Sequence, residues 1–386
     1  MPYRGAWTFW KHNRKVKQLL PYILAAFIFQ SVSAQDPELE WPVFRGKSDL
    51  TGFTANELTS SPSLLWSYSA GTRSRSSPVI SSGTIFFGTD KGNILAVEND
   101  GKLKWKYEGG GSAESPPLVY GNSVITGFGD GSLHSVDRTT GKLLWKYKTD
   151  NQIVGSANYW STGKSSGIVV GSYDYFLHSV NPVNGRFQWK LETENYVNGT
   201  PSVLNNNIVF GGCDGIIRVA DAVTGREKDT IQIGVYIASS PALSGGKACF
   251  GDYDGNLYCL DMLTGKLIWE VKANENSGSV LSIPAIGRNL VVVGNEDKYM
   301  YCYDLITGRL RWKFRTNGRI TGSAVLTPTK VIFGSLDGYV YMLNQADGKK
   351  IWSFNTGAPV SSSPAVSGDR FFILTEDGRL LAFGKK

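Results

Sequence analysis

Aspartate is the residue with possible chemistry that recurs most regularly along this chain of 386 residues. It returns about every 40 residues, and in most copies a glycine follows it directly. Carboxylates gathered around one rim could bind cations or a basic partner. An Asp-Gly pair is also what a tight turn between strands prefers, and we interpret these residues as turn residues. They are Asp130, Asp174, Asp214, Asp254, Asp297, Asp337 and Asp377.

Histidine gives little support for catalysis. Only His134 and His178 follow residue 34, and both fall at one position of a repeat in which other copies carry Leu, Arg or Tyr. That interchange predicts a half-exposed packing position. A His-Glu-x-x-His metal motif is missing from the sequence, and a Ser-His-Asp triad would have to use one of these two histidines. We therefore predict neither catalytic residues nor metal ligands.

The four cysteines are Cys213, Cys249, Cys259 and Cys302. They form neither a Cys-x-x-Cys motif nor an adjacent pair, so zinc and haem are not indicated. Cys259 and Cys302 occupy a position that other copies fill with small or apolar residues, which predicts core packing. Cys249 and Cys259 lie on neighbouring predicted strands, and a disulfide between them in an oxidising compartment stays open at this point.

Tryptophan sets the period of the elements that carry these residues. It recurs at intervals of about 40 residues, and in one copy Asp229 takes its place. A fixed period of this length indicates a supersecondary unit that must stack on copies of itself. The seven tryptophans and Asp229 together predict eight copies. We expect the junction at Asp229 to be the weakest. The tryptophans are Trp66, Trp105, Trp145, Trp189, Trp269, Trp312 and Trp352.

Each copy contains four short runs rich in β-branched and aromatic residues, which we label strands A to D. In one copy they occupy 240–243, 247–251, 254–260 and 261–269. Proline recurs in the A run, which predicts an edge strand, and the B run is continuously apolar. Four-stranded antiparallel sheets repeated around an axis are propeller blades. Loops from D to A and turns from B to C then lie on one face.

The two ends of the repeat region complement each other. Residues 64–68 read as a D strand without A, B or C before it, and residues 363–383 supply A, B and C. Together they make one blade and leave no unpaired strand. The sequence therefore predicts an all-β, eight-bladed β-propeller of four-stranded antiparallel blades, closed by an N-terminal outer strand that completes the C-terminal blade.

These repeats resemble the PQQ-type β-propeller repeat of the quinoprotein alcohol dehydrogenase-like superfamily, with its Ala-x-Asp-x-x-Thr-Gly-x-x-x-Trp core. The best matches run from Asp137 to Trp145, from Asp261 to Trp269 and from Asp304 to Trp312. The resemblance covers about residues 62 to 386, and within this group the length and blade count are most similar to BamB, an outer-membrane-protein assembly lipoprotein. It implies that each tryptophan docks its blade onto the next.

Two segments precede the propeller, which we expect at residues 63–386. Residues 1–34 are basic, then apolar, and end in Val-Ser-Ala, which predicts a signal peptide cleaved after Ala34 and a mature chain without a transmembrane span. An uncleaved anchor is the alternative. No cysteine lies near the cleavage point, so the lipid attachment of BamB is not supported. Residues 35–62 predict a lead-in strap packed on the ring or, alternatively, a partner-binding arm.

Charge argues against a nucleic-acid partner. The formal net charge is +7, but five of the basic residues lie in the acid-free residues 1–34, so the rest of the chain is close to neutral. The variable D-to-A loops are where we expect function on a repeat scaffold. Candidate partner-binding residues in these loops are Arg73, Arg75, Asn195, Tyr196, Tyr236, Asn276 and Arg319.

Two functional classes follow from these patterns. The favoured class is a non-enzymatic, monomeric scaffold of the periplasm or the secreted space, which binds protein partners without a cofactor and assists outer-membrane protein assembly as BamB does. The alternative is a quinoprotein oxidoreductase of alcohols or sugars that uses PQQ and Ca²⁺. The chain is short for that class and lacks the adjacent cysteine pair that the resemblance associates with it.

Overall fold

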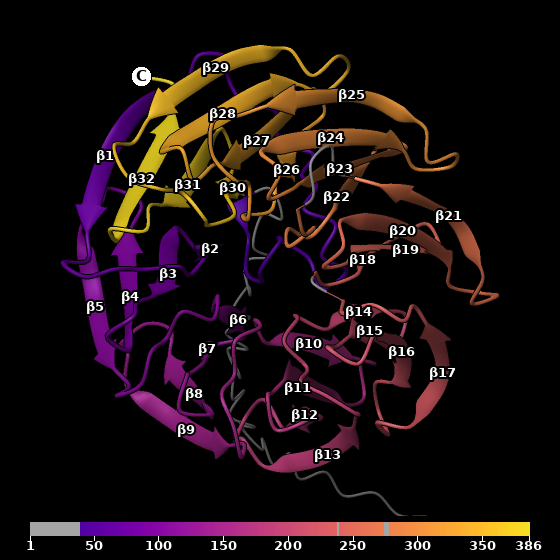
Figure 1. Ribbon diagram of the computed structural model, residues 1–386. Helices are drawn as coiled ribbons and strands as arrows, with labels where there is room; N and C mark the ends of the chain where they lie inside the picture. Colours follow the sequence, from indigo (N-terminus) through magenta and orange to yellow (C-terminus); the bar gives the residue numbers. More distant parts are fainter. Residues whose placement is uncertain (1–38, 238, 274–277) are drawn as a thin grey trace, which may run out of the picture. The chain divides into compact units, whose positions relative to one another are not determined.

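Eight four-stranded antiparallel sheets stand around one axis in the computed structural model of this chain (Figure 1). The structure describes residues 39–237, 239–273 and 278–386, within the unit Gln35–Lys386. The predicted eight-bladed, all-β propeller is confirmed. The predicted signal peptide lies outside the described residues. Among the residues described, no helix could cross a membrane.

Each blade runs from its inner strand A to its outer strand D, and blades are numbered in chain order. Blades 1 to 3 contain β2 (Val79–Ser81), β3 (Thr84–Gly88), β4 (Asn93–Glu98), β5 (Leu103–Glu108); β6 (Leu118–Tyr120), β7 (Ser123–Gly127), β8 (Ser132–Asp137), β9 (Leu143–Lys148); and β10 (Asn158–Ser161), β11 (Ser166–Gly171), β12 (Phe176–Val180), β13 (Phe187–Glu192). Blades 4 to 6 contain β14 (Ser202–Leu204), β15 (Asn207–Gly211), β16 (Ile216–Asp221), β17 (Glu227–Gln232); β18 (Ala242–Ser244), β19 (Lys247–Gly251), β20 (Asn256–Asp261), β21 (Leu267–Lys272); and β22 (Ala285–Gly287), β23 (Leu290–Gly294), β24 (Tyr299–Asp304), β25 (Leu310–Arg315). Blades 7 and 8 contain β26 (Val325–Leu326), β27 (Lys330–Gly334), β28 (Tyr339–Asn344), β29 (Lys350–Asn355); and β30 (Ala365–Ser367), β31 (Arg370–Leu374), β32 (Arg379–Gly384) with β1 (Ser63–Ser69).

The B strands are buried on both faces, whereas the D strands cover the outside. All five residues of β27 are buried, as its continuous apolar sequence requires. In β9 only Trp145 is buried, and its neighbours in the strand face solvent wholly or in part. The hydrophobic clusters lie between blades, and one of them joins Trp189 of blade 3 to Phe210 of blade 4.

Closure of the ring follows the predicted scheme. β1 pairs antiparallel with β32 from Ser63 opposite Gly384 to Ser69 opposite Arg379. Figure 1 shows the indigo strand β1 beside the yellow strand β32. The N-terminal strand thereby becomes the outer strand of blade 8 and removes an exposed edge.

Tryptophans of the D strands lie at the blade junctions. In six junctions the indole Nε1 donates to a backbone carbonyl of the next blade's C-to-D turn, at 2.8–3.1 Å. The glycine of that turn stands directly over the indole, as Gly308 stands over Trp269. Trp352 differs, because blade 8 has no covalent C-to-D turn, and it packs edge-on against Phe383 at 5.4 Å. At the junction between blades 4 and 5, Gly265 lies over the Asp229 carboxylate instead.

Residues 39–57 form a strap that crosses the ring on the A-to-B loop side. Its backbone exchanges hydrogen bonds with Ile80 and accepts them from the amides of Val119, Val203, Leu243, Ile286 and Leu326, each at the A strand of a different blade. Asn158 and Ser367 add side-chain bonds to the strap carbonyls from blades 3 and 8. One segment therefore contacts all eight blades.

Arg45 is the buried centre of the strap. Its guanidinium donates to the carbonyl of Ala324 and, at 3.5 Å, to that of Pro284, which belong to adjacent blades. Burial lowers the pKa of Arg45 to about 9, and the nearby Asp49 partly opposes this shift. A cation held by backbone carbonyls of two blades ties the strap to the ring.

Candidate functional site

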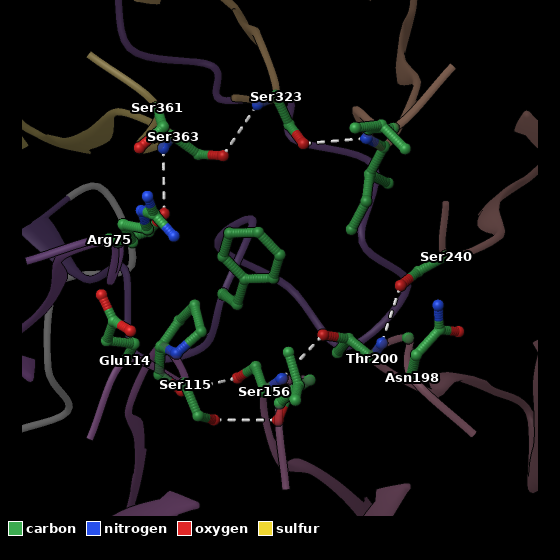
Figure 2. A pocket seen from close by; sticks show the side chains of 18 of the residues that line it. Arg75, Glu114, Ser115, Ser156, Asn198, Thr200, Ser240, Ser323, Ser361 and Ser363 are labelled. Atoms are coloured by element: carbon green, nitrogen blue, oxygen red, sulfur yellow. Dashed lines mark hydrogen bonds between the residues drawn. The ribbon is translucent and has the colours of Figure 1, made fainter. Parts of the chain in front are cut away.

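An axial cavity of about 570 Å³ opens on the D-to-A loop side of the ring. Phe44 of the strap lines it together with D-to-A loops from around the ring (Figure 2). The strap lies at the other end of the ring axis, on the A-to-B loop side. It therefore closes that end of the cavity. The walls are mixed, with Gln152, Asn198 and several serines beside apolar residues such as Ile153 and Leu281.

Hydroxyl side chains at the foot of the A strands link several pairs of neighbouring blades. The amide of one blade donates to the hydroxyl of the next: Ser156 to Thr200 at 3.0 Å, Thr200 to Ser240 at 2.7 Å, and Ser323 to Ser363 at 3.0 Å. The Ser363 amide likewise donates to the hydroxyl of Ser77 in blade 1, at 2.9 Å. These hydroxyls therefore lock neighbouring blades together as well as lining the cavity. Sequence analysis missed these hydroxyl links, although the Ser or Thr that precedes most A-strand prolines was a usable signal.

Two charged side chains reach the cavity. Arg75 lies 3.7 Å from Glu376 through its Nε, and Glu114 accepts a hydrogen bond from Ser112 at 3.3 Å. In Figure 2 Glu114 and Asn198 stand on opposite sides of the cavity. Glu114 is the one carboxylate among the lining residues, and the described residues contain no group of three metal-ligating side chains. Ca²⁺ takes six to eight oxygen ligands, often carboxylates. At this cavity Glu114 is the one carboxylate that could contribute, and the other oxygen donors are neutral side chains and backbone carbonyls.

An aromatic surface lies beside the cavity on the same face. Tyr196 stacks on Tyr173 with ring centroids 4.6 Å apart and contacts Tyr175 at 5.2 Å. Tyr236 meets Tyr253 edge-on at 6.3 Å. Four of the rings, all except Tyr173, are 36–57% exposed. We call these five residues the tyrosine patch. They come from D-to-A loops and B-to-C turns of blades 3 to 5, which confirms that both kinds of connection share one face.

The structure brings some of the predicted partner-binding residues together and separates others. Tyr196 and Tyr236 both belong to the tyrosine patch. Asn195 supports the patch, because its side-chain Oδ1 accepts from the Tyr196 amide at 2.8 Å. Arg73 and Arg75 lie near blade 8, where both approach Glu376. Arg319 pairs with Glu296 at 3.1 Å, while the predicted residue Asn276 lies outside the described residues. Tyr173, Tyr175 and Tyr253 were missed by the sequence analysis.

The recurring aspartates serve their own turns. Asp174 accepts from the Phe176 amide at 3.1 Å and contacts His178 Nε2 at 3.0 Å. Asp214 repeats this arrangement with Arg218 at 2.7 Å, and Asp337 with the Tyr341 hydroxyl at 2.8 Å. Each of the three also accepts from an amide that follows the outer strand of the preceding blade, at 2.9–3.3 Å. These carboxylates therefore join neighbouring blades and do not converge on one ligand.

The position occupied by His134 and His178 was predicted to be half-exposed, and that prediction is wrong. Both histidines are buried, as are Arg218 and Tyr301 at the equivalent positions. Alternation along a strand identifies the face of a residue, but here the neighbouring blade covers that face. Burial lowers the pKa of His134 to about 4, and Tyr107 contacts its Nδ1 at 3.1 Å.

The cysteines are all free thiols. Cys249 lies directly opposite Cys259 in the pairing of β19 with β20, and both are buried. Burial raises the pKa of Cys302 to about 12, which keeps that thiol protonated.

The repeats and the ring geometry define an eight-bladed propeller of the PQQ-type repeat class. The chain belongs to the family described as outer membrane protein assembly factor BamB, whose model matches residues 54–170, 130–280 and 228–383. The predicted resemblance is confirmed. No curated protein matches this chain in sequence.

Solved structures share the fold. BamB from Moraxella catarrhalis superposes with a TM-score of 0.72 and 19% identity, covering 84% of this chain and 98% of that one. Quinohemoprotein alcohol dehydrogenase from Comamonas testosteroni gives a TM-score of 0.78 and 13% identity, covering 92% and 82%. A europium-containing methanol dehydrogenase gives 0.74 and 14%, covering 90% and 89%. At these identities the likeness concerns the fold, which scaffold and enzyme have in common.

Proposed function

We propose that this protein is an exported, non-enzymatic scaffold that binds protein partners through its D-to-A loop face and assists the assembly of outer-membrane proteins. The observation that carries the proposal is the tyrosine patch, in which four exposed tyrosines from three consecutive blades lie on one face, Tyr175 and Tyr196 around Tyr173 and Tyr236 against Tyr253. Membership of the family described as outer membrane protein assembly factor BamB supports the assembly role.

Exposed, pre-stacked tyrosines are suited to binding proteins. Tyrosine supplies a large apolar surface and a hydroxyl, and it is enriched at the energetic centres of protein interfaces. The loops that carry the patch are joined by backbone bonds, from the Cys213 amide to Tyr196 and from the Tyr253 amide to Tyr236. Because the tyrosine rings are already held in place, binding a partner would cost these side chains little conformational entropy.

The cellular location and the oligomeric state belong to the same proposal. The basic, apolar and Val-Ser-Ala order of residues 1–34 supports export by a cleaved signal peptide. We propose that the mature protein works as a monomer in the periplasm or the secreted space.

The oxidoreductase alternative draws support from the fold shared with quinohemoprotein alcohol dehydrogenase. Its difficulty is the donor set of the axial cavity, in which Glu114 is the single carboxylate. A thermal melt with PQQ and Ca²⁺ separates the two functions. We expect an unchanged melting temperature, and a rise of several degrees with dye reduction by alcohols or sugars would establish the enzyme instead.

Site-specific photo-cross-linking tests the scaffold function. A photoreactive amino acid placed at Tyr196 or at Tyr236 should yield one and the same protein adduct in cells. Ile351, which is exposed on the outer strand of blade 7, is the matched control and should yield none. Equal adducts at all three positions, or none at the tyrosines, would contradict the proposed binding face.

A further inference from the structure

The C-to-D turns of four consecutive blades hold apolar side chains out into solvent. The residue two before the turn glycine is Val183 in blade 3, Val223 in blade 4, Leu263 in blade 5 and Ile306 in blade 6. These side chains are 82, 43, 93 and 52% exposed, respectively. The same position carries Thr or Ala in blades 2 and 7. The apolar tips are therefore confined to one arc of the ring, from β13 to β25 in Figure 1.

The turns hold these tips rigidly. In blade 5 the Asp261 carboxylate accepts from the amides of Leu263 at 3.0 Å and Thr264 at 2.8 Å. Asp221 and Asp304 make the same bonds in blades 4 and 6. Equivalent turns of a closed ring stand at equal height along its axis. The four tips thus face one plane.

A cation follows the glycine in each of these turns. These residues are Arg186, Arg226, Lys266 and Arg309, all exposed. No ion pair involves any of the four within the part of the chain that the structure describes. Two nearby acids are already paired, Asp221 with Lys228 at 2.8 Å and Asp304 with Arg311 at 2.5 Å. In blade 5 the Asp261 carboxylate accepts from the amides and hydroxyl of its own turn. Each apolar tip therefore has an unpaired positive charge beside it.

We propose that this surface, the C-to-D tips of blades 3 to 6, binds an anionic lipid bilayer. Isolated aliphatic tips can enter between lipid headgroups, while adjacent Lys and Arg side chains meet the phosphates. A protein interface would rather present a continuous patch with aromatic anchors, and the four tips include no aromatic residue. The tips lie on the face opposite the D-to-A loops, so a bilayer there leaves the tyrosine patch uncovered. The inference uses none of the residues of the proposed partner-binding face.

Vesicle co-sedimentation tests this proposal with the full chain. Vesicles of phosphatidylcholine with about one-third phosphatidylglycerol are compared with pure phosphatidylcholine. We expect binding to the anionic vesicles, and the double variant Val183→Ser with Leu263→Ser should lower the partition coefficient at least roughly tenfold. Arg186→Gln with Lys266→Gln should weaken binding to anionic vesicles alone. The control, Leu103→Ser with Leu144→Ser, changes two leucines that are 46 and 49% exposed on the outer strands of blades 1 and 2 and should bind as the parent protein does.

Each variant is first melted, so that only folded protein enters the comparison. Loss of binding in the tip variants, with the control unaffected, supports a lipid-facing surface. Absence of binding to anionic vesicles, or an equal loss in the control, overturns the proposal. If the tips instead change the molecular mass in sedimentation equilibrium without any lipid binding, the surface joins copies of this chain and the lipid proposal is wrong.

Discussion

The junction between blades 4 and 5 lacks the indole that all seven other junctions have, and restoring it should stabilise the ring. Asp229 occupies the tryptophan position and is exposed, and its carboxylate accepts from the Thr230 amide at 2.9 Å. Gly265 of the next turn lies over it, as the equivalent glycines lie over indoles elsewhere. The substitution Asp229→Trp therefore fills a place that the fold already provides.

The size of the gain follows from the intact junctions. Burying an indole removes roughly 200 Å² from water, which sets an upper limit of about 5 kcal/mol. Residual burial in the unfolded chain and loss of rotamer freedom remove about half of this. The indole N–H should reach the Met262 carbonyl, the counterpart of the Leu305 carbonyl that Trp269 contacts at 2.9 Å, and add about 1 kcal/mol. We expect a net gain of about 3 kcal/mol at this junction.

Thermal melting and hydrogen exchange measure this effect. The melting temperature should rise by several degrees, and amides of β17 and β20 should exchange more slowly. Asp229→Phe is the matched control, since it restores the buried ring without the N–H and should recover only part of the gain. An unchanged or lower melting temperature for Asp229→Trp would refute the claim that the missing indole weakens this junction.

Two further predictions concern closure and pH. Deleting 63–68 removes most of β1 and exposes the edge of β32, so hydrogen exchange across 361–383 should accelerate; unchanged protection there would mean that blade 8 is complete without β1. His134 has a folded pKa of about 4 against an ordinary value of 6.5, so its stabilising contribution is fully present above pH 6.5 and is lost as the pH falls toward 4. The substitution His134→Leu places at this position the residue that Leu95 and Leu381 supply at the equivalent positions. It should reduce the loss of unfolding free energy over this pH range by about 2 kcal/mol, after allowance for solvent screening. Urea unfolding at pH 7 and at pH 4.5 measures the difference. Parallel pH profiles for the two proteins would contradict this assignment.

The fold was predictable because every blade repeats the same local signals. A tryptophan period, Asp-Gly turns and apolar B runs agree with one another, and the unpaired strand at 64–68 identified how the ring closes. The path of the strap was not predictable in the same way. Its bonds to A strands run mainly through backbone groups, as between Ser48 and Val203, and backbone groups leave no residue signature.

The candidate site was only partly predictable, for a related reason. Tyr196 and Tyr236 were found because they lie in the variable D-to-A loops. Their partners Tyr173 and Tyr253 lie in B-to-C turns, where the Asp that serves the turn dominated the interpretation. Which turn meets which loop depends on how blades pack side by side, and the period of one chain segment does not contain that information.

The strap gives the ring two unequal faces. Phe44 lines the axial cavity, and the strap behind it contacts every A strand, so a partner's side chain could enter the axis only from the D-to-A loop side. The tyrosine patch stands on this open side, whereas the apolar and cationic tips stand on the other. On our two proposals, a bilayer would contact the face that carries the C-to-D tips. The D-to-A loop face would then stay available to a protein partner. The two proposals can be refuted separately, because substitutions at Tyr196 and at Leu263 change surfaces on opposite faces of a rigid ring.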